Sequence, residues 1–192
     1  MTARMGFLVL AVLVVNACAP VKLIEPPRAT IADGFSVDPQ IRWASLPSRS
    51  GIDLWTVDGA TLEALTFFKG VADGQPLYRG GIAGGPDEDK RPKFRAAMTP
   101  TDIAELFVDS YAMLQAQKIE TTGLRPAKFG TADGFRFEMT WVTPAGLEMQ
   151  NLVAGAVVKS RLYAVAYSGT RVHYFARYRD TVENLLKSVN VQ

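Results

Sequence analysis

Two kinds of side chain that serve as nucleophile or general base occur once each in this sequence, as Cys18 and His173. An imidazole that acts as a general base needs a nucleophile beside it and an acid that orients it. Ser168 and Asp180 are near His173 in the sequence, but Asp180 follows by seven positions, about two helical turns. We therefore predict no catalytic residue and interpret His173 as a surface or interface residue.

A metal site in this chain would depend on carboxylates, because zinc sites are commonly built from several cysteines and histidines. The acidic cluster Asp87-Glu88-Asp89 is followed by Lys90 and Arg91, which neutralise it. A solvated loop is the expected environment of such a run. We predict neither a metal site nor a cofactor.

Glycines and charged residues dominate residues 69–93. Residues 80–85 match neither the Walker pattern nor the dinucleotide fingerprint. Long loops in compact domains are usually functional or disordered. The sequence thus predicts a long surface loop, either an interaction site or disordered, with these candidate interaction residues: Gly80, Gly81, Gly84, Gly85, Asp87, Glu88, Asp89, Lys90 and Arg91.

A second candidate surface is basic and consists of Arg171, Arg177 and Arg179 near the C-terminus. Guanidinium groups recognise phosphates and carboxylates, so this surface could contact anionic lipid headgroups or an acidic partner. A solvated helix face is the alternative interpretation.

Residues 1–17 have the organisation of a secretory signal, with Arg4 before an apolar run at 7–15. Val15-Asn16-Ala17-Cys18 resembles the lipobox of bacterial lipoproteins, although Asn16 departs from the usual small or β-branched residue. The resemblance implies that the Cys18 thiol receives a diacylglycerol and that the signal is cut before it. Ala19, where inner-membrane retention usually has aspartate, implies the periplasmic face of the outer membrane. The membrane is then a partner through the lipid on Cys18.

Three alternatives to the lipobox remain: a transmembrane helix, an ordinary signal peptide with an incidental cysteine, and a buried core helix. A spanning helix needs roughly 20 apolar residues, more than the run at 7–15 provides. The proline-rich sequence that follows disfavours a core helix.

Composition limits the classes of protein to which this chain can belong. The chain has 192 residues and a formal charge of +2, so it lacks the basic surface of a nucleic-acid-binding protein. Removal of the signal leaves material for one domain. Because Cys18 is the only cysteine, an exported domain would depend on packing and not on disulfides.

The organisation expected after the signal is a tether followed by one domain. Residues 18–40 contain several prolines and no hydrophobic periodicity, which predicts an extended tether. An irregular segment packed on the domain at 31–37 is the alternative. The single domain is expected over residues 41–192.

Turn and cap residues predict the first elements of this domain. Asp58-Gly59 separates two β-rich runs, at 52–57 and 61–68, and predicts a hairpin. Thr99 and Pro100 are typical of a helix start, and the helix is expected to end near Gln117.

The C-terminal half predicts a meander and a final helix. Residues 134–142 alternate, with Phe137 and its apolar neighbours on one face. Strands are expected at 147–158 and 162–167. Thr170 is expected to cap the last helix, which carries an apolar stripe of Val172, Phe175, Tyr178, Val182, Leu185 and Val189.

This order favours an α+β fold, in which helices sandwich an antiparallel sheet. Residues 99–189 resemble the PsbP-like fold, which is named for an extrinsic subunit of photosystem II and occurs in many small bacterial lipoproteins. The resemblance is carried by the capped helix, the strand Ala132-Asp133-Gly134-Phe135-Arg136-Phe137-Glu138 and the segments 162–167 and 185–189. The hairpin and the glycine-rich loop are additions to that pattern. A fold of this kind implies no chemistry by itself.

We therefore expect a lipid-anchored, non-enzymatic accessory or protein-interaction module of the bacterial cell envelope, with an envelope protein as partner. The alternative is a binding module for a small apolar or lipidic ligand, held between sheet and helix. An apolar cavity of about 300 Å³ or more would favour that alternative. A hydrolase, third, would require a cleft that brings His173 to a serine or a carboxylate.

Overall fold

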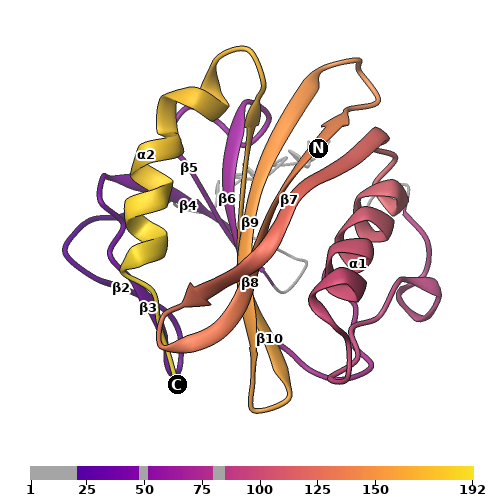
Figure 1. The fold of residues 1–192 in the computed structure, drawn as a ribbon. Coiled ribbons are helices and arrows are strands. Elements are labelled where there is room, and N and C mark those ends of the chain that lie inside the picture. The colour runs from indigo at the N-terminus through magenta and orange to yellow at the C-terminus, as the bar shows by residue number, and fades with distance from the viewer. Residues whose placement is uncertain (1–20, 48–51, 80–84) are drawn as a thin grey trace, which may run out of the picture.

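The computed structural model describes residues 21–47, 52–79 and 85–192. Within these ranges eight antiparallel strands form one sheet in the order β1-β4-β5-β6-β10-β9-β8-β7 (Figure 1). Their bounds are β1 Lys22–Ile24, β4 Trp43–Leu46, β5 Asp53–Thr56, β6 Glu63–Val71, β7 Gln117–Phe129, β8 Ala132–Val142, β9 Glu148–Val158 and β10 Arg161–Thr170.

The predicted meander is confirmed by β8, β9 and β10, which pair in sequence. Lys159 and Ser160 form the β9–β10 turn, with φ of 49° and 61°. Strand β7 was not predicted; it pairs with β8 and lies at one edge of the sheet. Most residues of β7 are exposed, so the strand has no apolar alternation to detect.

The Asp58-Gly59 hairpin is also confirmed, because β5 and β6 pair antiparallel. Its connection spans residues 57–62, longer than the shortest hairpin turns. Gly59 has a φ of 112°, which a residue with a side chain rarely adopts.

Helix α1 (Pro100–Met113) packs on one face of the sheet. The predicted start is correct: the Thr99 side chain accepts from the Asp102 amide, and the Asp102 side chain accepts from the Thr99 amide. The helix ends at Met113, earlier than expected. Its buried side chains join a core that includes Phe68, Phe135 and Phe137.

The opposite face is covered by α2 (Tyr174–Lys187) and by a small sheet in the order β11-β3-β2. The bounds of these strands are β2 Ala29–Ala32, β3 Phe35–Val37 and β11 Asn190–Val191. Four residues of the predicted stripe in α2 and Val189 beyond it are buried, but Val172 is 92% exposed. Val172 lies outside the helix because α2 begins at Tyr174.

Residues 22–37 contradict the predicted tether. They supply β1, which pairs with β4 in the main sheet, and β2 and β3, which pair with each other. Phe35 and Val37 are buried, with 1% and 0% of their surface exposed. The folded part therefore begins at Lys22 and not at residue 41. The predicted signal, residues 1–17, and Cys18 lie outside the described residues.

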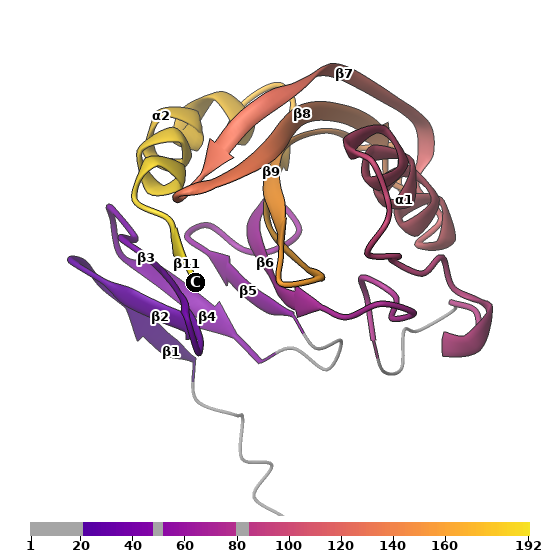
Figure 2. The ribbon, with the colours of Figure 1, turned by 60° about the horizontal axis from the view of Figure 1, so that its bottom comes forward.

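The prediction that helices sandwich the sheet is only partly met. Figure 2 shows α1 and α2 at separate ends of the strongly curved sheet. Helix α1 covers part of one face of the sheet, and α2 covers part of the other. Strands β2, β3 and β11 complete the cover on the α2 side. Buried residues such as Leu77 and Phe94 contribute to the cover on the α1 side. The architecture is a mostly antiparallel β-fold with two α-helices in the described ranges.

In the part of the chain that the structure describes, no helix has the length and apolarity that crossing a membrane requires.

Candidate functional site: an apolar hollow beside helix α1

A hollow of about 540 Å³ lies between the start of α1 and strands β7, β8 and β9. Its floor includes the buried side chains of Ile103 and Phe135. Its rim includes Leu124, which is 38% exposed. The remaining lining residues are Met98, Pro100, Thr101, Arg125, Pro126, Asp133, Gly134 and Val157. We call this set the α1 hollow.

The α1 hollow is mainly apolar, because most of its lining side chains are hydrocarbon or thioether. Asp133 is the acidic residue among them, and it forms an ion pair with Lys128 at 2.6 Å. Ligand pockets are typically about 300–1,000 Å³ and predominantly hydrophobic. The α1 hollow has this size and character.

Local sequence explains why the hollow is built at this position. The Thr99–Asp102 capping box and Pro100 at the first turn fix where α1 begins. On the sheet side, a Cβ at Gly134 would lie 2.1 Å from the carbonyl oxygen of Gly155. Glycine at position 134 thus permits the close approach of β8 to β9 below the hollow.

A buried polar network lies deeper under α1 and was not predicted. The Asn151 amide donates to the Tyr111 hydroxyl at 2.8 Å, and the Trp141 indole donates to the Asn151 carbonyl oxygen at 2.9 Å. Burial raises the pKa of Tyr111, and it raises the pKa of Tyr78 well above its usual range. Both phenols therefore remain neutral, and the network fixes α1 on the sheet. The sequence signal that could have indicated this network is the polar residue Asn151 within a mainly apolar strand.

At the other end of the sheet, the carboxylate of Glu63 organises the β5–β6 connection. Its Oε1 accepts hydrogen bonds from the Thr56 hydroxyl and from the amides of Val57 and Asp58. Glu63 is fully buried, and its Oε2 has no hydrogen-bond partner in the described structure. This glutamate is a structural anchor for the loop that presents Asp58 to α2.

Tyr178 links that loop to α2, because its hydroxyl donates to Asp58 Oδ2 at 2.5 Å. Burial and this hydrogen bond raise the pKa of Tyr178 to about 12.

A raised tyrosine pKa contributes stability that is complete below about pH 10, the pKa of an unfolded tyrosine, and is lost as pH rises through the folded value. We expect the free energy of unfolding to decrease from pH 10 to about 12, and to decrease less steeply in Tyr178→Phe. Urea denaturation across this window measures both slopes, and equal slopes would contradict the assignment.

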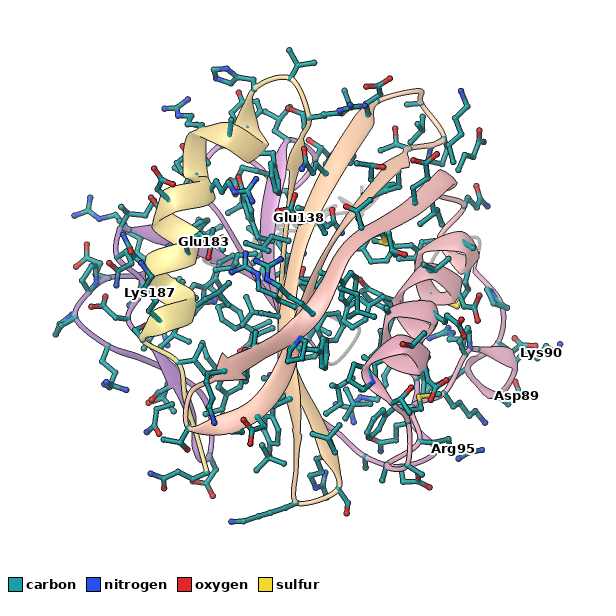
Figure 3. The ribbon with its side chains drawn as sticks, in the orientation of Figure 1. Asp89, Lys90, Arg95, Glu138, Glu183 and Lys187 are labelled. Atoms are coloured by element: carbon teal, nitrogen blue, oxygen red, sulfur yellow. The ribbon has the colours of Figure 1, made fainter. Side chains whose placement is uncertain are left out.

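The predicted basic surface is neutralised by acidic partners. Arg171 lies 3.5 Å from Glu148, Arg177 lies 3.7 Å from Asp58, and Arg179 lies 2.5 Å from Glu138. Figure 3 shows Glu138 and Glu183 between α2 and the sheet. Glu183 binds Arg136 through two hydrogen bonds, of 2.6 and 3.1 Å. Arg177 and Arg179 therefore form ionic contacts that hold α2, whereas Arg171 precedes the helix and pairs with the start of β9, so the three are not a free cationic patch.

The predicted interaction loop divides into parts of different character. Gly80, Gly81 and Gly84 lie outside the described residues. Asp87 and the 3₁₀ turn η1 (Glu88–Lys90) are exposed, and Asp89 and Lys90 point away from the domain in Figure 3. Gly85, which precedes this turn, is half-buried.

Arg91 corrects the prediction of a solvated loop. It is 6% exposed and donates to the carbonyl oxygens of Tyr78 and Pro86, each at 3.0 Å. Pro76 also pairs with Lys93, which closes the base of the segment. Arg91 is thus a structural anchor and not part of an accessible interaction surface.

His173 precedes α2 and is exposed. In the described structure its imidazole contacts the ring of Tyr174 at 4.8 Å and makes no hydrogen bond to Ser168 or Asp180. No group of three or more His, Cys, Asp or Glu residues suited to a metal ion occurs within the described ranges. The described geometry brings no acid–base pair to the α1 hollow.

Comparison with known proteins gives no match to a family model or to the sequence of a curated protein. Solved structures do match. LpqN, "involved in cell envelope biogenesis of Mycobacterium tuberculosis", is 7% identical over 92% of this chain and 87% of its own, with a TM-score of 0.38. The solution structure of cyanobacterial PsbP (CyanoP) from Synechocystis sp. PCC 6803 is 10% identical over 92% of this chain and 95% of its own, with a TM-score of 0.52. The chain therefore has a PsbP-like fold.

Proposed function

We propose that this protein is a lipid-anchored component of the bacterial cell envelope that binds a small apolar or lipidic ligand in the α1 hollow, without converting it chemically. The observation that carries the proposal is the hollow itself, whose volume of about 540 Å³ exceeds the 300 Å³ threshold set above. The lipobox-like sequence at Cys18 supports the anchor, and Ala19 after it supports the periplasmic face of the outer membrane.

A second candidate function is capture of an envelope protein by the exposed turn at Asp87–Lys90. The anchoring of this turn through Arg91 favours it, because a fixed charged turn loses less conformational entropy on binding than a free loop. Replacement of residues 87–90 by glycine and serine would then abolish partner capture and leave ligand binding in the α1 hollow intact.

The ligand proposal predicts the effect of a charge on the rim of the hollow. We expect Leu124→Asp to weaken binding of dansyl-labelled undecanoic acid at least about tenfold, equivalent to about 1.4 kcal/mol, because the carboxylate must be desolvated next to the hydrocarbon chain. Fluorescence titration of the folded variants measures the dissociation constant.

Leu147→Asp is the matched control. Leu147 is 40% exposed, close to the 38% of Leu124, but it lies in the β8–β9 connection away from the hollow. We expect this control to bind the probe as the unmodified protein does. No binding by the unmodified protein, or equal loss in both variants, would contradict the proposal.

A further inference from the structure

The sheet leaves an aliphatic surface uncovered on its β1 border. Strand alternation places Leu23, Ala44, Leu46 and Leu54 on the side of β1, β4 and β5 opposite to the buried Trp43 and Trp55. Leu23 pairs with Ala44, and Leu46 pairs with Leu54, so the four are neighbours across the strands. Together with Val21 we call them the β1 face.

Neither hydrophobic core includes the β1 face. Val21 and Leu23 are 52% and 58% exposed, and the other three residues are half-buried. None of the five belongs to, or packs against, either core cluster. The β1 face is thus an aliphatic patch on the edge of the domain. Figure 2 shows where the strands that carry it, β1, β4 and β5, lie at this border of the sheet.

The short stretch of chain between Cys18 and Val21 limits how far this face can lie from a lipid on Cys18. Cys18 precedes Val21 by three residues, and consecutive Cα atoms are at most about 3.8 Å apart, so the two Cα atoms are within about 11 Å. The headgroup layer on each side of a bilayer is about 5–7 Å thick. A lipid on Cys18 would therefore hold the start of β1 at the membrane surface.

Charges beside the β1 face are compatible with that location. Arg42 pairs with Glu25 at 2.6 Å, and Asp53 pairs with Lys69 at 2.8 Å. Lys22, on β1 itself, has no acidic partner in the described chain, but it pairs with Ser45 and so leaves the strand on the side opposite to Leu23. The described charges at this border thus carry no excess of acid that would repel anionic phospholipid.

We propose that the β1 face rests on the phospholipid bilayer that holds the lipid anchor, so that the domain is fixed on the membrane through β1, β4 and β5. The proposal rests on the anchor of the proposed function and is independent of the α1 hollow. The short link keeps the local concentration of membrane high, and insertion of Val21 and Leu23 then adds apolar burial.

The test uses the full-length lipidated protein in vesicles of phosphatidylethanolamine and phosphatidylglycerol. Because lipidation consumes the sulfur of the only natural cysteine, a new cysteine is the one free thiol. Leu23→Cys, labelled with a small fluorophore, should be quenched at least about twofold more by brominated lipid than labelled Val172→Cys. Val172, at 92% exposure, lies just before α2, away from the β1 face.

Leu54→Cys provides a second position on the same face and should be quenched more than Val172→Cys as well. Circular dichroism verifies that each labelled protein is folded. Equal quenching at positions 23, 54 and 172 would overturn the proposal. A fatty-acid label should appear on the unmodified protein and disappear in Cys18→Ala; absence of that label would also overturn the proposal, whereas the ligand titration at the α1 hollow would stand.

Discussion

Removal of residues 1–40 is expected to prevent stable folding, although the remaining chain contains both α-helices and most of the sheet. The deleted part includes Ile31, Phe35 and Val37, which are 7%, 1% and 0% exposed. Burial of each such side chain contributes about 1.5–3 kcal/mol, so their combined loss is comparable to the 5–15 kcal/mol stability of a typical domain. Chemical denaturation of chains that begin at residue 21 and at residue 41 measures the difference.

Point variants show whether the loss of stability comes from the lost core side chains or from the deletion of the segment itself. The Phe35 ring lies 5.7 Å from the ring of Tyr163 and 6.1 Å from that of Phe67. We expect Phe35→Ala to cost about 3–5 kcal/mol. Leu23→Ala, in the same segment but 58% exposed, is expected to change stability by less than about 0.5 kcal/mol. Cooperative unfolding of residues 41–192 with undiminished stability would contradict this prediction.

The failure to predict these N-terminal strands has a physical cause. The strands β1, β2 and β3 have three or four residues each, too few to show a period, and Pro26 and Pro27 interrupt them. Their conformation depends on partners far away in the sequence, such as β11, which pairs with β3. Local sequence carries no signal of such partners, whereas the alternative of a packed segment at 31–37 pointed in the correct direction.

Strand β8 was predicted correctly because one of its faces is buried and the other is partly exposed, so its residues alternate in polarity. In β8, Phe135, Phe137 and Met139 are buried under α1, and the residues between them are half-buried beneath α2 or near solvent. The start of α1 depends on its own cap residues, so local sequence was sufficient. The end of that helix has no comparable signal, and the prediction there exceeded the observed helix.

The α1 hollow could not be located from sequence, because it arises between elements. Its size depends on the separation of α1 from β7, and β7 was not predicted at all. The structure places Ile103 and Phe135 both in the core and at the floor of the hollow. Sequence periodicity gives the inward side of an element but not how closely the facing element packs.

Phe137→Ala is expected to be among the most destabilising single substitutions in the chain. Phe137 is 0% exposed, and its ring lies 5.7 Å from that of Phe107 in α1 and 6.2 Å from that of Phe135. Truncation leaves a cavity between helix and sheet, which costs about 3–5 kcal/mol, a large fraction of the stability of a typical domain. Urea denaturation measures the change.

Val172→Ala is the matched control, because it also shortens an apolar side chain that the sequence assigned to the core. The structure leaves Val172 92% exposed before the first turn of α2, so the expected change is within about 0.5 kcal/mol. The pair of variants therefore tests the inward face of β8 and the start of α2 together. If Val172→Ala were the more destabilising, α2 would have to begin earlier and turn Val172 into the core; if Phe137→Ala were neutral, the two faces of β8 would be reversed.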